Sequence, residues 1–203
     1  MSTKVRCAVL ISGRGSNLAA LIAACRARDF PAAIVLAISN VEGADGLRHA
    51  DEAGIPTRVI SHRNYDSREA FDHVIDGALR EHEVSLVCEA GFMRIHGDKF
   101  VRRWEGRLIN IHPSLLPAFK GTRVHQQVLD AGVRISGCTV HFIVAEVDSG
   151  PIIAQAAVPV QMGDTVASLS TRVLEAEHGL YPEALRLVAE GRVKLENGKA
   201  VFV

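Results

Sequence analysis

Two polar side chains stand at the end of an apolar stretch in "RLINIHPSLLPAFKG", residues 107–121. Side chains on a strand alternate between its faces, so Asn110 and His112 should point to one side and Ile111 to the other. Pro113 lacks a backbone donor and directs the chain out of the sheet. An amide donor beside an imidazole suits stabilisation of an oxyanion combined with proton transfer. The pair could equally be two hydrogen-bonded residues at a strand end, because most buried polar side chains are simply satisfied.

A carboxylate could assist that histidine. Asp148 lies in "VAEVDSGPI", residues 144–152, in a Gly-Pro turn after an expected strand. Aspartate is common in turns for conformational reasons alone, so it needs no partner. If its side chain reaches His112, the negative charge favours the protonated imidazole. His112 would then be able to act as a general acid.

A third segment, "SGRGSN" at residues 12–17, lies between an apolar run and a helical pattern. Glycines allow a tight turn there, and the amides of Gly15, Ser16 and Asn17 would face an anion at the helix amino terminus. This predicts a site for a single phosphate. A dinucleotide is less favoured, because Leu18 stands where the glycine-rich fingerprint needs a small residue. The alternative is a helix-capping turn without a ligand, with Ser16 or Asn17 as the cap.

Alternating strands and helices would bring these three segments together. Apolar runs predict strands at residues 5–12, 32–39, 57–60, 84–91 and 107–112, with helical patterns after residue 17, at 46–54, from about 66, and at about 100–104. Such an alternation implies right-handed crossovers and a parallel sheet. Ligands of open α/β sheets bind beyond the carboxyl ends of the strands, which is where the three segments fall.

The rest of the chain changes character. Residues 137–144 and 150–160 are strand candidates, 165–177 and 182–191 are helical, and Asn197-Gly198 predicts a hairpin. We therefore expect a single domain over residues 1–203. Its predicted class is α/β, with an open, mostly parallel Rossmann-like sheet, helices on both faces, and a smaller carboxy-terminal α/β extension of the same domain.

Composition narrows the class of partner. Among 203 residues, 23 basic side chains balance 23 acidic ones, so a broad positive field for nucleic acid or an anionic membrane is not expected. A small-molecule partner is expected instead. The four cysteines are far apart and form neither a zinc nor a disulfide pattern, which indicates a reduced, cytoplasmic protein. No apolar run approaches the roughly 20 residues of a membrane helix, and the first one is too short for a signal peptide.

Seven segments together carry a family resemblance: "LISGRGSNL", "DSREAFD", "AGFMRI", "INIHPSLLPAFKG", "GCTVHFI", "VDSGPII" and "EHGLYP". With them the chain resembles the phosphoribosylglycinamide formyltransferases, folate-dependent enzymes of purine synthesis. The resemblance implies transfer of the formyl group of 10-formyltetrahydrofolate, the cosubstrate, to the amine of glycinamide ribonucleotide by direct attack. It assigns Asn110 to the oxyanion, His112 to general acid catalysis and Asp148 to support of the cation. No metal is implied.

The resemblance also implies where the ligands bind. Substrate would contact Gly15, Ser16, Asn17, Arg68, Asn110 and Glu177. Folate would lie in a cleft bordered by Met93, Arg94, Ile95 and His96 and by Val144, Ala145, Glu146, Val147 and Asp148. Residues 1–110 would then form the phosphate-binding α/β half, and residues 111–203 the folate-side half with the carboxy-terminal extension. Only small-molecule partners are implied, for a monomer or a homodimer.

Three positions depart from the family pattern. Glu89 stands where an apolar residue is usual and His96 where an aliphatic one is common, and both should lie near the folate pterin. Leu174 replaces a polar residue associated with the substrate phosphate in some members. A charged Glu89 would be costly to bury without a partner, so it should face solvent, find a donor or be protonated.

Two other functions compete with formyl transfer. A 10-formyltetrahydrofolate hydrolase would use the same three residues, Asn110, His112 and Asp148, with water as the nucleophile. Related hydrolases typically carry an amino-terminal regulatory domain and a second histidine in place of Pro113, which favours the transferase. A non-catalytic phosphate-binding module would account for residues 12–17 but would leave Asn110, His112 and Asp148 as coincidences.

Overall fold

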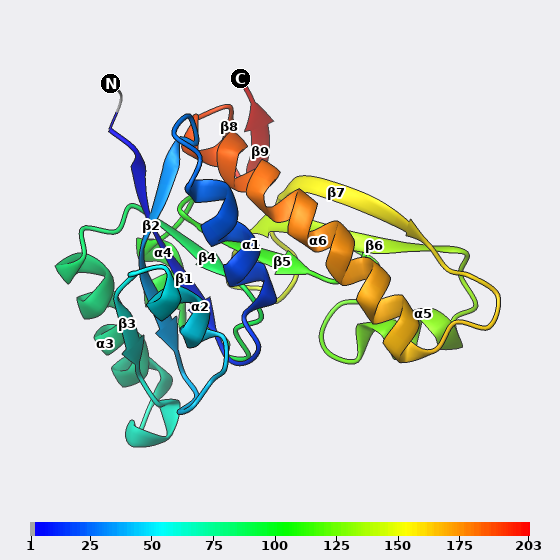
Figure 1. Cartoon of the computed structure of the whole chain (residues 1–203), viewed down its shortest axis with the longest axis horizontal. Coiled ribbons are helices and arrows are strands. Elements are labelled where there is room, and N and C mark those ends of the chain that lie inside the picture. The colour runs from blue at the N-terminus through cyan, green and yellow to red at the C-terminus, as the bar shows by residue number, and fades with distance from the viewer. Residues whose placement is uncertain (1–2) are drawn as a thin grey trace.

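The computed structural model describes residues 3–203, in which strands and helices alternate along the chain (Figure 1). The elements are β1 (Val5–Ile11), α1 (Ser16–Cys25), β2 (Ala32–Ser39), α2 (Leu47–Glu52), β3 (Thr57–Val59), the 3-10 helix η1 (His62–Asn64), α3 (Arg68–Glu81), β4 (Leu86–Glu89), α4 (Asp98–Arg103), β5 (Leu108–His112), α5 (Val124–Asp130), β6 (Ile135–Phe142), β7 (Ile152–Pro159), α6 (Val166–Ala189), β8 (Val193–Glu196) and β9 (Lys199–Phe202).

Seven strands form the main sheet, in the order β3-β2-β1-β4-β5-β6-β7. The strands from β3 to β5 pair in parallel, whereas β6 and β7 run antiparallel to their neighbours. This confirms the open, mostly parallel sheet. The chain moves outward in one direction from β1 to β3 and in the other from β4 onward, which creates a switch point between β1 and β4. Ligand sites of such sheets lie at this point, beyond the carboxyl ends of the strands.

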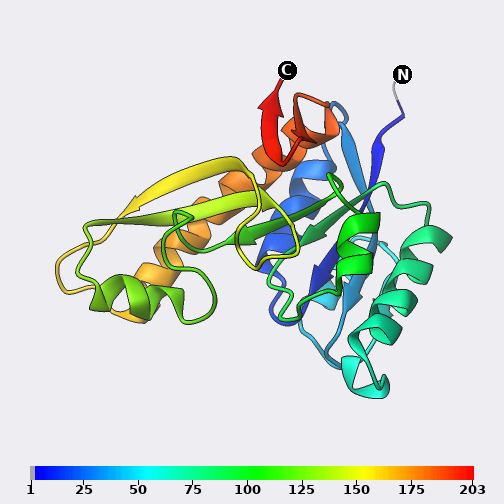
Figure 2. The same ribbon diagram turned by 180° about the vertical axis from the view of Figure 1, so that it is seen from behind.

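Helices cover both faces of the sheet, as predicted. Helices α1 and α6 lie together on the face seen in Figure 1, and α3 and α4 cover the opposite face seen in Figure 2. The side chains of β5 point alternately to these two faces. Ile109 and Ile111 pack in the apolar cluster beneath α1 and α6, while Leu108 packs in the cluster beneath α3. Asn110 and His112 share the face of Leu108 and lie where the strand emerges from the core.

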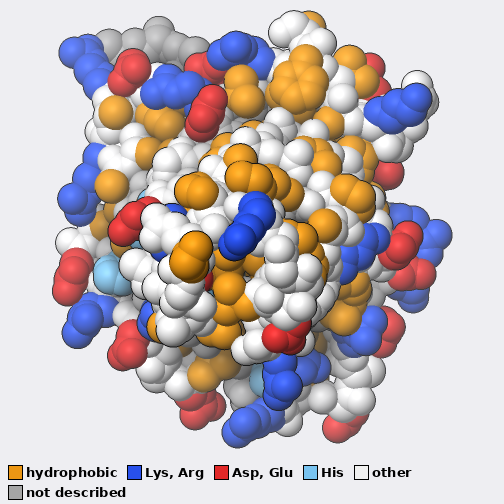
Figure 3. Space-filling view, turned by 90° about the vertical axis from the view of Figure 1, so that its right-hand side faces the viewer, with side chains coloured by type: hydrophobic (Ala, Val, Ile, Leu, Met, Phe, Trp, Pro, Cys, Tyr) orange, Lys and Arg blue, Asp and Glu red, His pale blue; other side chains and the backbone are white. Residues whose placement is uncertain are grey.

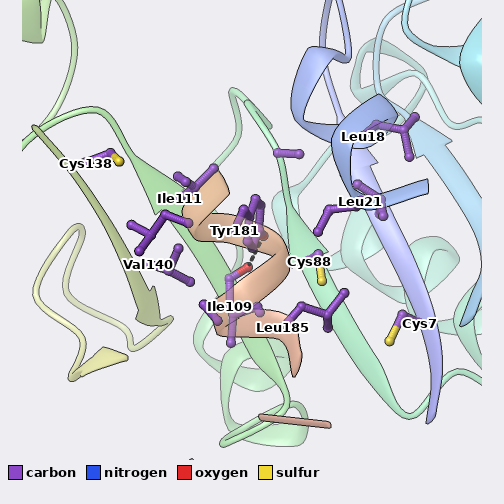
Figure 4. Packing of buried hydrophobic residues seen from close by; sticks show 14 of the residues in the cluster. Cys7, Leu18, Leu21, Cys88, Ile109, Ile111, Cys138, Val140, Tyr181 and Leu185 are labelled. Carbon is purple, nitrogen blue, oxygen red and sulfur yellow. Dashed lines mark hydrogen bonds between the residues drawn. The ribbon is translucent and has the colours of Figure 1, made fainter. Parts of the chain in front are cut away.

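The long helix α6 anchors the first of these clusters (Figure 4). The hydroxyl of the fully buried Tyr181 donates to the backbone oxygens of Glu89 (2.9 Å) and Ile109 (3.3 Å), at β4 and β5. Sequence periodicity marks two helical stretches here, but they form one 24-residue helix that includes Pro182. Its apolar residues continue along one buried face past the proline, which stabilises the helix through packing.

The carboxy-terminal residues form the predicted hairpin, in which β8 and β9 make a separate two-stranded sheet. Asn197 and Gly198 both have positive φ, as the tight turn requires. The short helix α5 was not anticipated. Acidic and basic side chains are mixed over the end of the molecule shown in Figure 3. Within residues 3–203, every helix is too short or too polar to cross a bilayer.

Candidate active site

A cavity of about 710 Å³ opens at the carboxyl ends of β1, β4 and β5. It is lined by Asn17 at the start of α1, by Asn110 and His112 of β5, and by Glu177 of α6. All nine residues expected at the folate cleft, 93–96 and 144–148, also line it. The structure therefore brings most of the predicted substrate, cosubstrate and catalytic residues to one place.

The side chain of Asn110 is oriented by a histidine on the neighbouring strand. His141 of β6 is its register partner, and Asn110 Nδ2 lies 3.3 Å from His141 Nε2. The other ring nitrogen, Nδ1, is 2.8 Å from the Phe142 carbonyl oxygen, which can only accept, so Nδ1 carries the hydrogen. Burial lowers the pKa of His141 and favours the neutral ring. Nε2 thus accepts one amide hydrogen of Asn110 and leaves the second N–H free.

Sequence reasoning recognised "GCTVHFI" but assigned no role to His141. The signal was its position in an alternating strand, with its side chain opposite to that of Val140. Its partner could not be identified, because an antiparallel pairing between β5 and β6 sets which residues face each other.

His112 is buried and has a polar neighbour near each ring nitrogen. Nε2 lies 2.9 Å from the backbone oxygen of Phe119, so Nε2 donates, and Nδ1 lies 3.5 Å from Asp148 Oδ1. The loop after Pro113 turns back through Ser114, whose hydroxyl donates to the oxygen of Ala118 at 2.6 Å. A neutral His112 therefore has its lone pair at Nδ1, next to a carboxylate.

Asp148 joins two loops of the cavity. Its φ of 51° places it in the left-handed region, and its Oδ2 accepts a hydrogen bond from the Gly121 amide at 2.8 Å. Its Oδ1 lies toward His112 and is 4.0 Å from His141 Nε2. Asp148 therefore reaches His112, as hypothesised, and the Oδ1 to Nδ1 distance is that of an ion pair rather than of a short hydrogen bond.

The glycine-rich loop forms the turn into α1. Gly15 is the residue before the helix, with φ of 68° and no side-chain cap. The amides of Ser16 and Asn17 in the first turn lack partners within the helix and are available to an anion. Gly15 itself is buried, and it packs so closely on Gly46 that a Cβ at position 15 would lie 2.5 Å from Gly46 Cα. Asn17 lines the cavity, whereas Gly15 and Ser16 are not among its lining residues.

Glu177 and Arg68 have different positions relative to the cavity. Glu177 is buried on its wall, and its Oε2 accepts from Asn17 Nδ2 at 2.7 Å. Burial raises the pKa of Glu177, and the hydrogen bond from Asn17 opposes this. Arg68 begins α3, is exposed, and is not among the lining residues. The structure unites Glu177 with the candidate phosphate loop but leaves Arg68 outside.

The residues that depart from the family pattern also line the cavity. Glu89 Oε1 lies 2.9 Å from His96 Nε2, at the distance of an ion pair but without the alignment of a hydrogen bond, and Leu174 lies on the α6 side. Further lining residues without an expected role are Arg14, Arg123 and His125. They come from loops and a short helix, where no periodic pattern marks them.

Comparisons with known proteins identify the family of the chain. Residues 5–185 match the formyl transferase family. The chain is 57% identical to a trifunctional purine biosynthetic protein, adenosine-3, of Gallus gallus over 98% of its own length, but spans only 20% of that protein. It is 42% identical to a phosphoribosylglycinamide formyltransferase of Escherichia coli, covering 95% of this chain and 91% of the relative.

Solved structures show the same fold. A glycinamide ribonucleotide transformylase from Symbiobacterium toebii superimposes with a TM-score of 0.95 at 46% identity, covering 98% of this chain and 94% of the other. A formyltetrahydrofolate deformylase from Pseudomonas syringae has a TM-score of 0.91 at 26% identity, covering 99% of this chain and 66% of the other.

Proposed function

The chain belongs to the formyl transferase family, and from this premise we propose that it transfers the formyl group of 10-formyltetrahydrofolate to the amine of glycinamide ribonucleotide in de novo purine biosynthesis. One observation carries the proposal: Asn110, His112 and Asp148 converge on a single cavity that also reaches the amino terminus of α1. That arrangement combines an oxyanion donor, a proton donor and a candidate phosphate site.

In the proposed reaction the substrate amine attacks the formyl carbon, and the carbonyl oxygen becomes an oxyanion. Asn110 donates the amide N–H that His141 leaves free. Because His141 holds the amide before the reaction, little reorganisation is needed when the charge develops. Removal of one such donor typically reduces the rate about 100-fold to 1000-fold.

Collapse of the tetrahedral intermediate breaks the bond to the folate nitrogen, which must gain a proton. Phe119 binds the Nε2–H of His112, so the transferable proton belongs at Nδ1, on the side of Asp148. The Asp148 carboxylate stabilises the imidazolium, and the proton released by the attacking amine replaces the one delivered. The step thus returns His112 to its starting state.

Substrate and cosubstrate occupy opposite sides of the trio in this proposal. The phosphate lies at the Gly15, Ser16 and Asn17 turn, with Glu177 holding Asn17 in place. The folate lies against residues 93–96 and 144–148. Arg68 remains a prediction, since only a ligand that extends beyond the cavity lining would reach it. No metal takes part in the proposed mechanism.

The main rival is release of formate from the same folate by water. The test is to incubate the protein with 10-formyltetrahydrofolate, with and without glycinamide ribonucleotide, and to follow the released folate spectroscopically. Release that depends on the ribonucleotide supports the transferase. Equal release in both samples would identify a hydrolase, and no release would favour a binding module.

A further inference from the structure

Three ionisable side chains are buried together beside the cavity, and the proposed transfer gives none of them a catalytic role. Asp72, Glu89 and His96 are 5%, 6% and 6% exposed. His96 Nδ1 lies 2.6 Å from Asp72 Oδ1, and His96 Nε2 lies 2.9 Å from Glu89 Oε1. Nδ1 is hydrogen-bonded to Asp72, whereas the Nε2 contact with Glu89 is an ion-pair distance without the alignment of a hydrogen bond. A neutral ring would leave the lone pair of one nitrogen beside a carboxylate, and the imidazolium avoids this. The geometry therefore favours a buried histidine cation.

The three residues connect separate parts of the fold. Glu89 ends β4 and is the register partner of Asn110 on β5, so the two side chains share one face of the sheet. Asp72 lies on α3, and its Oδ2 accepts a hydrogen bond from the Gly97 amide at 2.6 Å. His96 lies between β4 and α4 and links the sheet to α3.

Aromatic rings enclose the cation. The His96 ring stacks on Phe100 with centroids 4.1 Å apart and on Phe92 at 5.4 Å. An aromatic face attracts a cation, and the effect is larger when water is excluded. Trp104 packs against the far side of Phe100, with centroids 6.3 Å apart.

The segment that this cluster holds is a wall of the cavity. Residues 92–96 all line it, and they belong to no helix or strand. Met93 and Ile95 present exposed apolar side chains, 66% and 52% accessible, which is the kind of surface a flat heterocycle would cover. A wall without regular structure depends on side-chain contacts for its position.

We propose that His96 is a positioning residue for the cosubstrate: by binding Glu89 and Asp72 at once, it fixes the cavity wall of residues 92–96 in the geometry that receives the folate ring. The inference rests on the proposed function, because it takes the cosubstrate to be a folate. Loss of the cation would leave two buried carboxylates facing each other, and the wall would move to separate or hydrate them.

The charges around His96 give the wall a pH dependence. Glu89 faces the ring from β4 and Asp72 from α3, while Arg68 and Glu69 of α3 lie beside the neighbouring Gly97, and α4 contributes the Phe100 ring. Burial alone would lower the pKa of His96, but the two carboxylates raise it to about 9. The cluster is therefore intact at neutral pH and loses its cation above about pH 9.

Three variants test the role: His96→Leu, the double variant Glu89→Leu/His96→Leu, and the control His73→Leu, an exposed histidine adjacent to Asp72. The double variant removes a carboxylate together with the histidine, and an apolar pair in place of a buried ion pair is often tolerated. We expect His96→Leu to raise the KM for 10-formyltetrahydrofolate by roughly 10-fold to 100-fold. The KM for glycinamide ribonucleotide and kcat should stay within about threefold.

The second readout is binding of tetrahydrofolate by calorimetry between about pH 7 and pH 10, with emission of Trp104, the single tryptophan, reporting the aromatic stack. The wild type and His73→Leu should lose affinity together above about pH 9. The double variant should show only the pH dependence of the ligand itself.

Two results would overturn the inference: an unchanged folate KM in His96→Leu, or a loss of affinity at high pH that persists in the double variant. If His96→Leu does not fold, the pH comparison among the other three proteins decides. A wild-type protein that binds tetrahydrofolate without transferring formyl would refute the proposed function but leave the His96 measurement valid.

Discussion

Replacement of Gly15 by alanine should destabilise the turn between β1 and α1, whatever ligand it binds. Its φ of 68° is unfavourable for alanine by about 1 kcal/mol. The added Cβ would also lie 2.5 Å from Gly46 Cα and 3.2 Å from the Gly46 oxygen, which are backbone atoms that cannot rotate away. Overpacking of this kind typically costs about 1–3 kcal/mol, so we expect a total loss of about 2–4 kcal/mol.

For a chain of 203 residues that loss corresponds to a Tm lower by roughly 4–16 °C. Gly13→Ala is the matched control, because a Cβ at Gly13 meets no atom within 4 Å, and this glycine does not have positive φ. Calorimetric unfolding of both variants measures the difference. The KM for glycinamide ribonucleotide should rise in Gly15→Ala, since displacement of the turn moves the amides of Ser16 and Asn17. Equal Tm values would refute the packing argument and show that the loop relaxes away from Gly46.

Further predictions concern the catalytic trio and the buried cluster. Asn110→Ala should keep its circular dichroism spectrum and lose turnover about 100-fold to 1000-fold, and near-normal turnover would remove Asn110 from the mechanism. Asp148→Asn should reduce kcat by roughly 100-fold or more, with partial recovery at lower pH, and full activity would make Asp148 a loop residue only. Folding raises the pKa of His96 from 6.5 to about 9, so the protonated ring adds to the free energy of unfolding. This contribution is complete below pH 6.5 and is lost as the pH rises through about 9. That contribution is about 3 kcal/mol, so the Tm should fall more steeply over this range in the wild type than in Glu89→Leu/His96→Leu, and parallel curves would contradict it.

Local patterns in the sequence were sufficient for most of the strands and helices, although not for α5 or for the continuity of α6, and for the direction of side chains on β5. Period-two alternation placed Asn110 and His112 on one face of β5, and the glycines of residues 12–17 indicated a tight turn before α1. The alternation of strands and helices predicted the parallel sheet, and so the edge at which these segments meet. Each of these features depends on neighbours within a few residues of one another.

Contacts between distant segments were decided only by the tertiary structure. The pairing of β5 with β6 puts His141 against Asn110, and the packing of α3 against the residues after β4 puts Asp72 against His96. Arg68, assigned by resemblance to the substrate, lies outside the cavity lining. No sequence period connects such residues, because strand register and helix packing set their distances. The sequence by itself thus determined that Asn110, His112 and the turn of residues 12–17 lie at the carboxyl edge of the sheet, whereas the fold determined which distant groups contact them there.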